Sequence, residues 1–412
     1  MEFTRFELDN GLRVIHHQDP HSQTVILNIL YNVGARDEEA DKTGFAHLFE
    51  HLMFGGSVNI PQYDKVVEEA GGSNNAYTSN DITNYHISVP LENAETAFWL
   101  ESDRMLQLDF SQESLDVQRG VVVEEFKQRC HNAPFGMLWH HVRGLAYKVH
   151  PYRWPTIGLV TEHIERARLE DVEAFYYRFY HPNNAILCVT GALSLEETKA
   201  LSEKWFGSID RKGERNANRY PDEPIQTERR SLATEDLLPQ DAVLMAFRTP
   251  AYAELDWPVA GLLADICGGS ETSPLHVELV KEQGLFASAE AFHMKGLSEG
   301  LWMVYGILNE GRTHEEGEAA LRGILDRCST DIPSEERLVR CRNMATTRLL
   351  FEETNPMNRA QKLCYYENIG LLEHSGKEAA LLDAVNTSQL TQWASEFLSP
   401  EKSNVIYYSP RA

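Results

Sequence analysis

The chain carries two copies of one pattern, and this repeat limits its possible folds more than any other feature. Each copy has a strand, an apolar helix that ends in a glycine pair, and a short helix that ends at a further glycine. Gly55-Gly56 corresponds to Gly268-Gly269, and the same offset along the chain relates Gly71 to Gly284. Two copies of one unit predict two domains of the same kind.

Both halves mix strand and helix patterns, so we expect an α+β fold. Each domain is predicted to be a mostly antiparallel sheet packed with helices. The stretch over residues 210–226 is polar and contains two prolines, which is typical of a linker. We therefore expect an N-terminal domain over residues 1–212, a linker over 213–227 and a homologous C-terminal domain over 228–412.

The charge balance narrows the possible partners. With 38 basic and 62 acidic residues, the net charge is −24. Such acidity argues against nucleic acid or an anionic membrane as a partner, and favours basic or neutral ligands. A very soluble acidic protein without any such preference has the same composition.

The six cysteines form no Cys-x-x-Cys pair, so we interpret them as reduced thiols. The first residues show no basic-then-apolar leader, although a chain whose leader had been removed would have the same sequence. No apolar run is long enough to cross a bilayer. These features favour a cytoplasmic location.

The first copy contains the motif His47-x-x-Glu50-His51 in an apolar helix, with Thr43 as its expected N-cap. Residues three and four positions apart share one helix face. Two imidazoles there can hold a divalent metal, and a carboxylate between them reaches a water on that metal. The alternative is a solvent-facing or locally hydrogen-bonded trio on an amphipathic helix.

The second copy lacks this trio. The offset that relates the glycine pairs places Ala260, Leu263 and Ala264 opposite the trio, in the same order. Further along, where Ser111 corresponds to Ser334, the repeat places Arg348 opposite Glu125. A packing requirement would be kept in both copies, whereas a chemical site is needed only once, so the asymmetry favours a chemical role.

A catalytic zinc needs a third protein ligand on another element. The helix expected over residues 111–130 offers Glu124 and Glu125 beside several valines. An acid buried there is costly unless it is paired or bound to a metal. The alternative is an exposed acid whose charge is balanced by Lys127 and Arg129. This alternative is plausible for one of the two glutamates.

These patterns together resemble the pitrilysin, insulysin and mitochondrial-processing-peptidase superfamily of inverzincin zinc metallopeptidases. The resemblance covers nearly the whole chain and is closest to the half-sized bacterial type. The matching segments are Leu8–Val14, Gly44–Phe54, Gly71–Thr78, Arg119–Glu125, Phe179–Asn184, Ser273–Leu275 and Glu282–Leu285.

The resemblance implies that His47, His51 and Glu125 are the ligands of one Zn²⁺ per chain. Glu50 would be the general base that activates the zinc-bound water. The family usually has a glutamate one heptad before the third ligand, and this chain has Gln118. A glutamine can still hydrogen-bond a ligand, but it carries no charge.

The resemblance also assigns residues that bind substrate. Asn75, Ala76, Tyr77 and Thr78 would form an edge strand to which a peptide adds by β-augmentation, although an ordinary core strand has the same alternation.

In the second half, Arg359 and Tyr366 match an Arg/Tyr pair that binds the substrate carbonyl and steadies the developing oxyanion. Tyr365 competes for the tyrosine role on spacing alone.

The expected function is a clamshell-type zinc endopeptidase that hydrolyses peptides or unfolded polypeptides inside a closed chamber. A homodimer is the simplest assembly, because one chain carries both the metal motif and the Arg/Tyr pair. A heterodimer with a metal-less homologue is the other possibility. Three alternatives remain: an inactive structural relative, a peptide-binding module that keeps the metal for stability, and a hydrolase of non-peptide amides.

Overall fold

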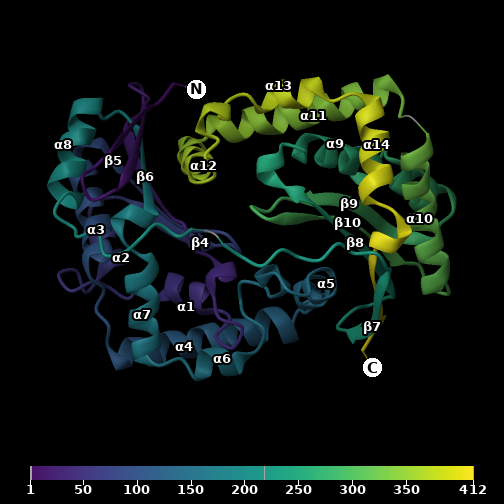
Figure 1. The fold of residues 1–412 in the computed structure, drawn as a ribbon, viewed down its shortest axis with the longest axis horizontal. Coiled ribbons are helices and arrows are strands. Elements are labelled where there is room, and N and C mark those ends of the chain that lie inside the picture. The colour runs from purple at the N-terminus through teal and green to yellow at the C-terminus, as the bar shows by residue number, and fades with distance from the viewer. Residues whose placement is uncertain (1, 218, 332, 412) are drawn as a thin grey trace. The chain divides into compact units, whose positions relative to one another are not determined.

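The protein, in a computed structural model that describes residues 2–217, 219–331 and 333–411, forms two compact units (Figure 1). The first unit comprises Met1–Phe126, Trp154–Tyr220 and Phe351–Gly376. The second comprises Lys127–Arg153, Pro221–Leu350 and Lys377–Ala412. None of the described helices is long and apolar enough to cross a membrane.

The first unit is built on a six-stranded sheet. Its strands, in spatial order, are β1 (Thr4–Glu7), β2 (Arg13–Gln18), β6 (Ala185–Gly191), β3 (Thr24–Tyr31), β5 (Thr83–Pro90) and β4 (Ser73–Thr78). Only the β2–β6 pair is parallel, and the other neighbours are antiparallel. Strand β4 therefore lies at one edge of the sheet.

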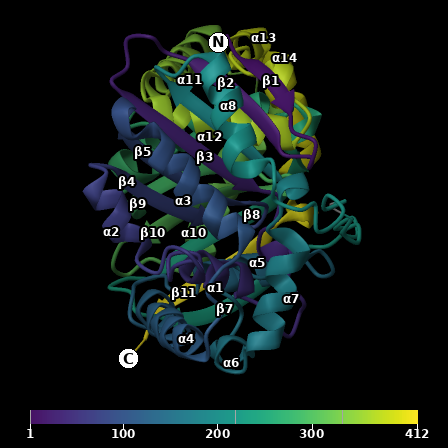
Figure 2. The same cartoon turned by 90° about the vertical axis from the view of Figure 1, so that its left-hand side faces the viewer.

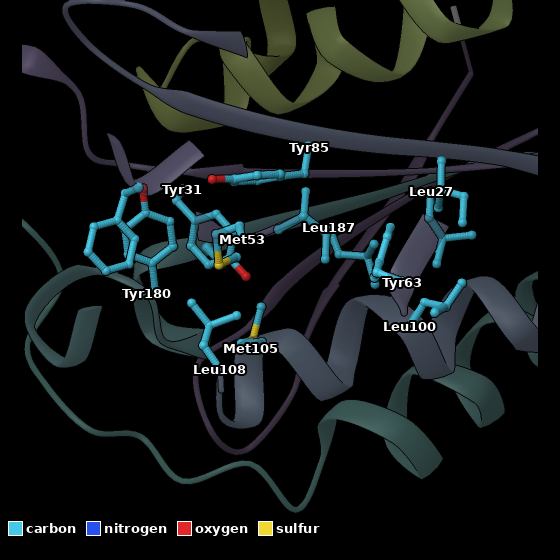
Figure 3. Packing of buried hydrophobic residues seen from close by; sticks show 14 of the residues in the cluster. Leu27, Tyr31, Met53, Tyr63, Tyr85, Leu100, Met105, Leu108, Tyr180 and Leu187 are labelled. Carbon is cyan, nitrogen blue, oxygen red and sulfur yellow. The ribbon is translucent and has the colours of Figure 1, made fainter. Parts of the chain in front are cut away.

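Most helices of this unit pack on one face of the sheet. They are α1 (Phe45–Leu52), α2 (Tyr63–Glu69), α3 (Ala94–Leu106), α4 (Gln112–Phe126), α6 (Thr161–Glu165), α7 (Leu169–Phe179) and α8 (Leu195–Phe206). Figure 2 shows α3 and α8 lying across the strands. Alternate residues of β3, such as Leu27 and Tyr31, point into this core beside Met53, Leu100 and Met105 (Figure 3).

The opposite face of the same sheet is covered by α12 (Pro356–Asn368), which comes from the second half of the sequence. Cys364 on α12 lies against β3 and β6, where its thiol donates to the carbonyls of Asn28, at 3.6 Å, and Ile186, at 3.7 Å. The sheet thus has the main core on one side and α12 on the other.

The second unit repeats this plan with five strands. Their spatial order is β7 (Arg230–Asp236), β11 (Asn404–Pro410), β8 (Ala242–Ala251), β10 (Glu299–Leu308) and β9 (Phe286–Met294), with only β7–β11 parallel. Its helices include α5 (Leu138–Ala146), α9 (Trp257–Gly268), α10 (His314–Thr330), most of α11 (Glu335–Thr354), α13 (Glu378–Ala384) and α14 (Thr387–Phe397).

The predicted fold class is confirmed: each unit has a mostly antiparallel sheet packed with helices. The units are not contiguous in sequence, because α5 packs with the second sheet and α12 with the first. Side chains such as Val142 of α5 share a core with Leu244 and Ile406. The domain limits around the predicted linker over 213–227 remain a prediction. In the structure, α5 from the first half of the chain packs in the second unit, and α12 from the second half packs in the first unit.

Candidate metal centre

Helix α1 is fixed at its first turn by a buried acid outside the motif. The carboxylate of Glu38 accepts hydrogen bonds from the backbone amides of Gly44, at 3.0 Å, and Ala46, at 2.8 Å. Amides in a first turn have no partner within their helix, so the Glu38 oxygens supply acceptors that these amides would otherwise lack. The predicted N-cap Thr43 is wrong: the cap is Gly44, and the Thr43 hydroxyl lies 2.8 Å from Nδ1 of His163.

The three polar residues of the motif share one face of α1. His47, Glu50 and His51 are each partly buried, as their spacing of three and four residues predicts. The other side of the helix lies in the core, through Phe45, Leu48, Phe49 and Leu52. Core packing therefore sets the rotation of the helix and aims the trio away from the core.

Helix α4 brings a carboxylate to this trio. Oε2 of Glu125 lies 3.6 Å from Nε2 of His47 and 3.3 Å from Nε2 of His51. The side chains of His47, His51 and Glu125 are 12%, 24% and 19% exposed. The neighbouring Glu124 is exposed to solvent on another side of α4. The structure thus brings together the three residues that the sequence suggests as ligands, with Glu125 rather than Glu124 as the carboxylate.

The donor set and its spacing fit a zinc ion. One donor atom from each of His47, His51 and Glu125 lies within 4.8 Å of the others. Ligand atoms about 2.1 Å from a tetrahedral ion are roughly 3.4 Å apart, close to the observed separations of 3.3 and 3.6 Å. Three protein ligands leave one position open, as in catalytic zinc sites.

Glu50 lies on the same face of α1, and its surroundings change the pKa of its carboxyl. Burial raises the pKa of its carboxyl above the ordinary value, and the negative charge of Glu125 adds to this rise. Thr78 and His51 oppose it by favouring the charged form of Glu50. A carboxyl whose pKa lies closer to neutrality than usual is suited to accept a proton and release it again.

The edge strand β4 adjoins this carboxyl through Thr78. Along β4, the side chains of Asn75 and Tyr77 are exposed, whereas Ala76 and Thr78 are partly buried. Strand β4 pairs with β5 along one edge, and no described strand of the sheet pairs with its other edge. The structure therefore places the predicted peptide-binding strand at an open sheet edge next to Glu50.

The remaining predicted residues lie on α4 and α12. Gln118 is partly buried on α4, two turns before Glu125. Arg359 lies on α12, where its Nη2 is 3.2 Å from Oδ2 of Asp19, and Tyr366 on the same helix is buried. Since α12 covers the sheet face opposite to the core that contains α1, the structure does not bring Arg359 or Tyr366 to His47, His51 and Glu125 of the same unit.

Comparison with known proteins gives matches to two sequence families. Residues 13–157 match the family described as "Insulinase (Peptidase family M16)", and residues 166–344 match "Peptidase M16 inactive domain". The first match contains the cluster of His47, His51 and Glu125. The second match includes the part of the chain in which the polar trio has no counterpart.

Individual proteins similar to this chain also carry peptidase names. The chain is 32% identical over 323 residues to a protein named zinc protease PqqE from Helicobacter pylori, covering 77% of this chain and 72% of the relative. It is 26% identical over 319 residues to a probable mitochondrial-processing peptidase subunit beta from Schizosaccharomyces pombe, covering 74% and 69%. A crystal structure of a protease from Helicobacter pylori superposes with a TM-score of 0.91 at 25% identity, covering 99% and 100% of the two chains.

Proposed function

Because the chain belongs to the M16, or insulinase, family of peptidases, we propose that it is a zinc-dependent endopeptidase that cleaves peptides or unfolded polypeptides in a closed chamber. The observation that carries this proposal is the convergence of His47, His51 and Glu125 beside Glu50. The alternative, a non-catalytic peptide-binding homologue, remains the other outcome of the tests below.

In this proposal His47, His51 and Glu125 would hold one zinc ion. When bound, zinc supplies a Lewis acid that polarises the scissile carbonyl and lowers the pKa of water. The naming of relatives as zinc proteases supports zinc as the metal.

The carboxylate of Glu50 acts as the general base. It takes a proton from the attacking water and then passes that proton to the amide nitrogen of the leaving peptide. The raised pKa of Glu50 helps it to hold this proton between the two transfers. Thr78 on β4 favours the charged form of this carboxyl, so the proposed base lies beside the strand on which the substrate would lie.

Strand β4 supplies the binding surface for the peptide. An extended segment that pairs with the free edge formed by Asn75, Ala76, Tyr77 and Thr78 would be read through its backbone. Such pairing places a peptide bond near Glu50 without selecting a particular side chain. We therefore expect broad sequence tolerance and a requirement for extended, unfolded substrates.

Arg359 and Tyr366 complete the site from a second copy of the chain. Their place across the sheet from α1 supports this assignment, since they cannot serve the metal ligands of their own unit without moving through the sheet. A homodimer provides the pair in trans, and a metal-less homologue in a heterodimer would do the same. The likeness to a peptidase named as a subunit supports a partnered assembly.

A digest of a mixed peptide library, read by mass spectrometry, tests the proposed activity. Cleavage should require the metal: a chelator should abolish it, and added zinc should restore it. Products cut at internal amide bonds identify an endopeptidase. Binding of peptides without any cleavage would support the non-catalytic alternative.

Complementation between two inactive variants tests the shared site. The Glu50→Gln variant lacks the base, and an Arg359→Ala variant lacks the proposed oxyanion contact. If the site forms in trans, a mixed dimer contains one site with both residues intact, so mixing restores part of the activity. If mixing restores none, Arg359 does not act from a partner chain.

A further inference from the structure

A second feature of the first unit lies at the start of β2 and the end of α12. It is a pocket of about 390 Å³ at the opposite end of the strand order from β4. Its charged lining residues are Arg5, Arg13, Arg215, Glu367 and Glu373. Three arginines against two glutamates give this pocket a net positive charge, on a chain whose net charge is −24.

Arg13 is the unusual member of this group. Its side chain is only 3% exposed. Nη1 donates weakly to Glu367, with separations of 3.5 Å to the backbone oxygen and 3.4 Å to Oε1. Among the described residues, Nε and Nη2 have no hydrogen-bond partner. A buried guanidinium with unmet donors is costly, so its retention calls for a counter-charge.

The available glutamate does not fully supply that charge. Oε1 of Glu367 is also 2.8 Å from Nη2 of Arg5, so one carboxylate serves two guanidinium groups. Burial and the nearby positive charge of Arg215 lower the pKa of Arg13 to about 10, which shows that its surroundings disfavour its charge. An anion in the pocket would add a further negative charge beside these arginines.

We propose that this pocket binds a small oxyanion, as inorganic phosphate or as a phosphate or carboxylate group of a small molecule. Guanidinium groups recognise both kinds of oxyanion through paired, charge-assisted hydrogen bonds. Phe3 and Leu372 add an apolar wall. The site therefore suits an anionic head with a short apolar portion better than it suits a cation or a neutral sugar.

The alternative is that Arg13 serves only to join β2 to the end of α12. That role would need the contact with Glu367, but it would not need Arg215. Arg215 is exposed on the segment after α8, and the salt bridges of Glu367 within the described part of the chain go to Arg5 and Arg13 instead. Substitution of Arg215 leaves the contact of Arg13 with Glu367 in place and, among the described residues, removes only the 3.4 Å hydrogen bond from its own Nε to the backbone oxygen of Asn183.

Isothermal titration calorimetry with sodium phosphate, and with sodium succinate in a second arm, tests the proposal on the full chain. Sodium chloride at equal ionic strength is the reference in thermal unfolding. We expect saturable binding of at least one of the two oxyanions and a raised melting temperature. Arg215→Gln should weaken this binding about tenfold, the effect of one lost charge-assisted contact.

The matched control is Arg211→Gln, an exposed arginine on the same segment that does not line the pocket. It should leave binding unchanged. Arg13→Gln should abolish binding if the variant folds, and Arg215→Gln keeps the test decisive if it does not. Absence of binding by the parent chain overturns the proposal, as does equal binding by the parent and Arg215→Gln. Peptide cleavage is not read in this test, so its result is independent of the proposed peptidase activity.

Discussion

Arg348 on α11 donates a hydrogen bond to Asp265 on α9, and this pair joins the two helices that correspond by the repeat to α4 and α1. Arg348 occupies the position that Glu125 has in the first copy of the repeat. Where the first unit brings two imidazoles to a carboxylate, the second unit has a single ion pair. The two copies thus keep the helix pair but use different chemistry to join it.

This difference predicts that the chain binds one zinc ion rather than two. Glu125→Gln removes a ligand and should lower zinc affinity by more than the roughly 10–100-fold typical of an outer hydrogen-bond partner. Asp265→Asn is the matched control at the corresponding helix pair and should leave zinc binding unchanged. Metal analysis after dialysis measures both. Two ions per parent chain, or equal affinity in Glu125→Gln, would contradict the assignment.

The hydrogen bonds of Glu38 lead to a second prediction, which concerns the free energy of unfolding. Glu38→Ala leaves the amides of Gly44 and Ala46 buried without their acceptor, at a cost of about 1–3 kcal/mol for each unsatisfied group. The adjacent Glu39 is mostly exposed, so Glu39→Ala should change stability by less than about 0.5 kcal/mol. Urea unfolding of the two variants makes the comparison. Equal stabilities would show that Glu38 does not hold α1.

The third prediction concerns the buried ion pair of Arg104 and Glu101, whose loss should lower the stability of the fold. Nε of Arg104 lies 3.0 Å from Oε2 of Glu101, and the guanidinium stacks over Tyr85 at 4.4 Å and Tyr63 at 4.7 Å. Glu101→Gln leaves a buried charge without its counter-ion, which costs about 3–5 kcal/mol. Glu95→Gln, which breaks a solvent-exposed ion pair with Lys204, is the control for thermal unfolding. A similar, small change in both variants would refute the prediction.

His293 predicts how stability depends on pH. Burial, with a smaller contribution from Lys295, lowers its pKa from 6.5 to about 3. The folded state therefore disfavours the protonated imidazole more than the unfolded state does. The contribution of His293 to the free energy of unfolding is complete above pH 6.5 and is lost as the pH falls towards 3. The loss is at most about 1.4 kcal/mol per pH unit.

The measurement is the free energy of unfolding as a function of pH for the parent chain and for His293→Gln. The variant should lose this part of the slope, whereas His21→Gln, at an exposed histidine, should keep it. An unchanged slope in His293→Gln would mean that another group controls acid unfolding.

That the side chains of His47, Glu50 and His51 lie on one face of α1 could be predicted from the sequence, for a physical reason. His47, Glu50 and His51 lie within one helical turn, so local periodicity alone places them on one face. The absence of the trio from the second copy singled it out. The choice of Glu125 over Glu124 needed the resemblance to a known family, and the exposure of Glu124 is a consequence of how α4 packs.

Long-range packing could not be predicted in the same way. Glu38 looks like one of several solvated acids in its loop, and only the fold shows its bonds to Gly44 and Ala46. The exchange of α5 and α12 between the units likewise depends on which sheet covers each apolar face, and helix periodicity does not specify this partner. For Arg359 and Tyr366, the sequence suggested a role and gave no place in the fold.

The most direct test of the central claim compares the parent chain with Glu50→Gln and measures zinc content and peptide cleavage on the same samples. Glutamine keeps the shape of the side chain, but its amide cannot accept the proton. We predict one zinc per chain in both proteins and a loss of cleavage of at least about 100-fold in the variant. Cleavage by zinc-loaded Glu50→Gln at the rate of the parent would contradict it.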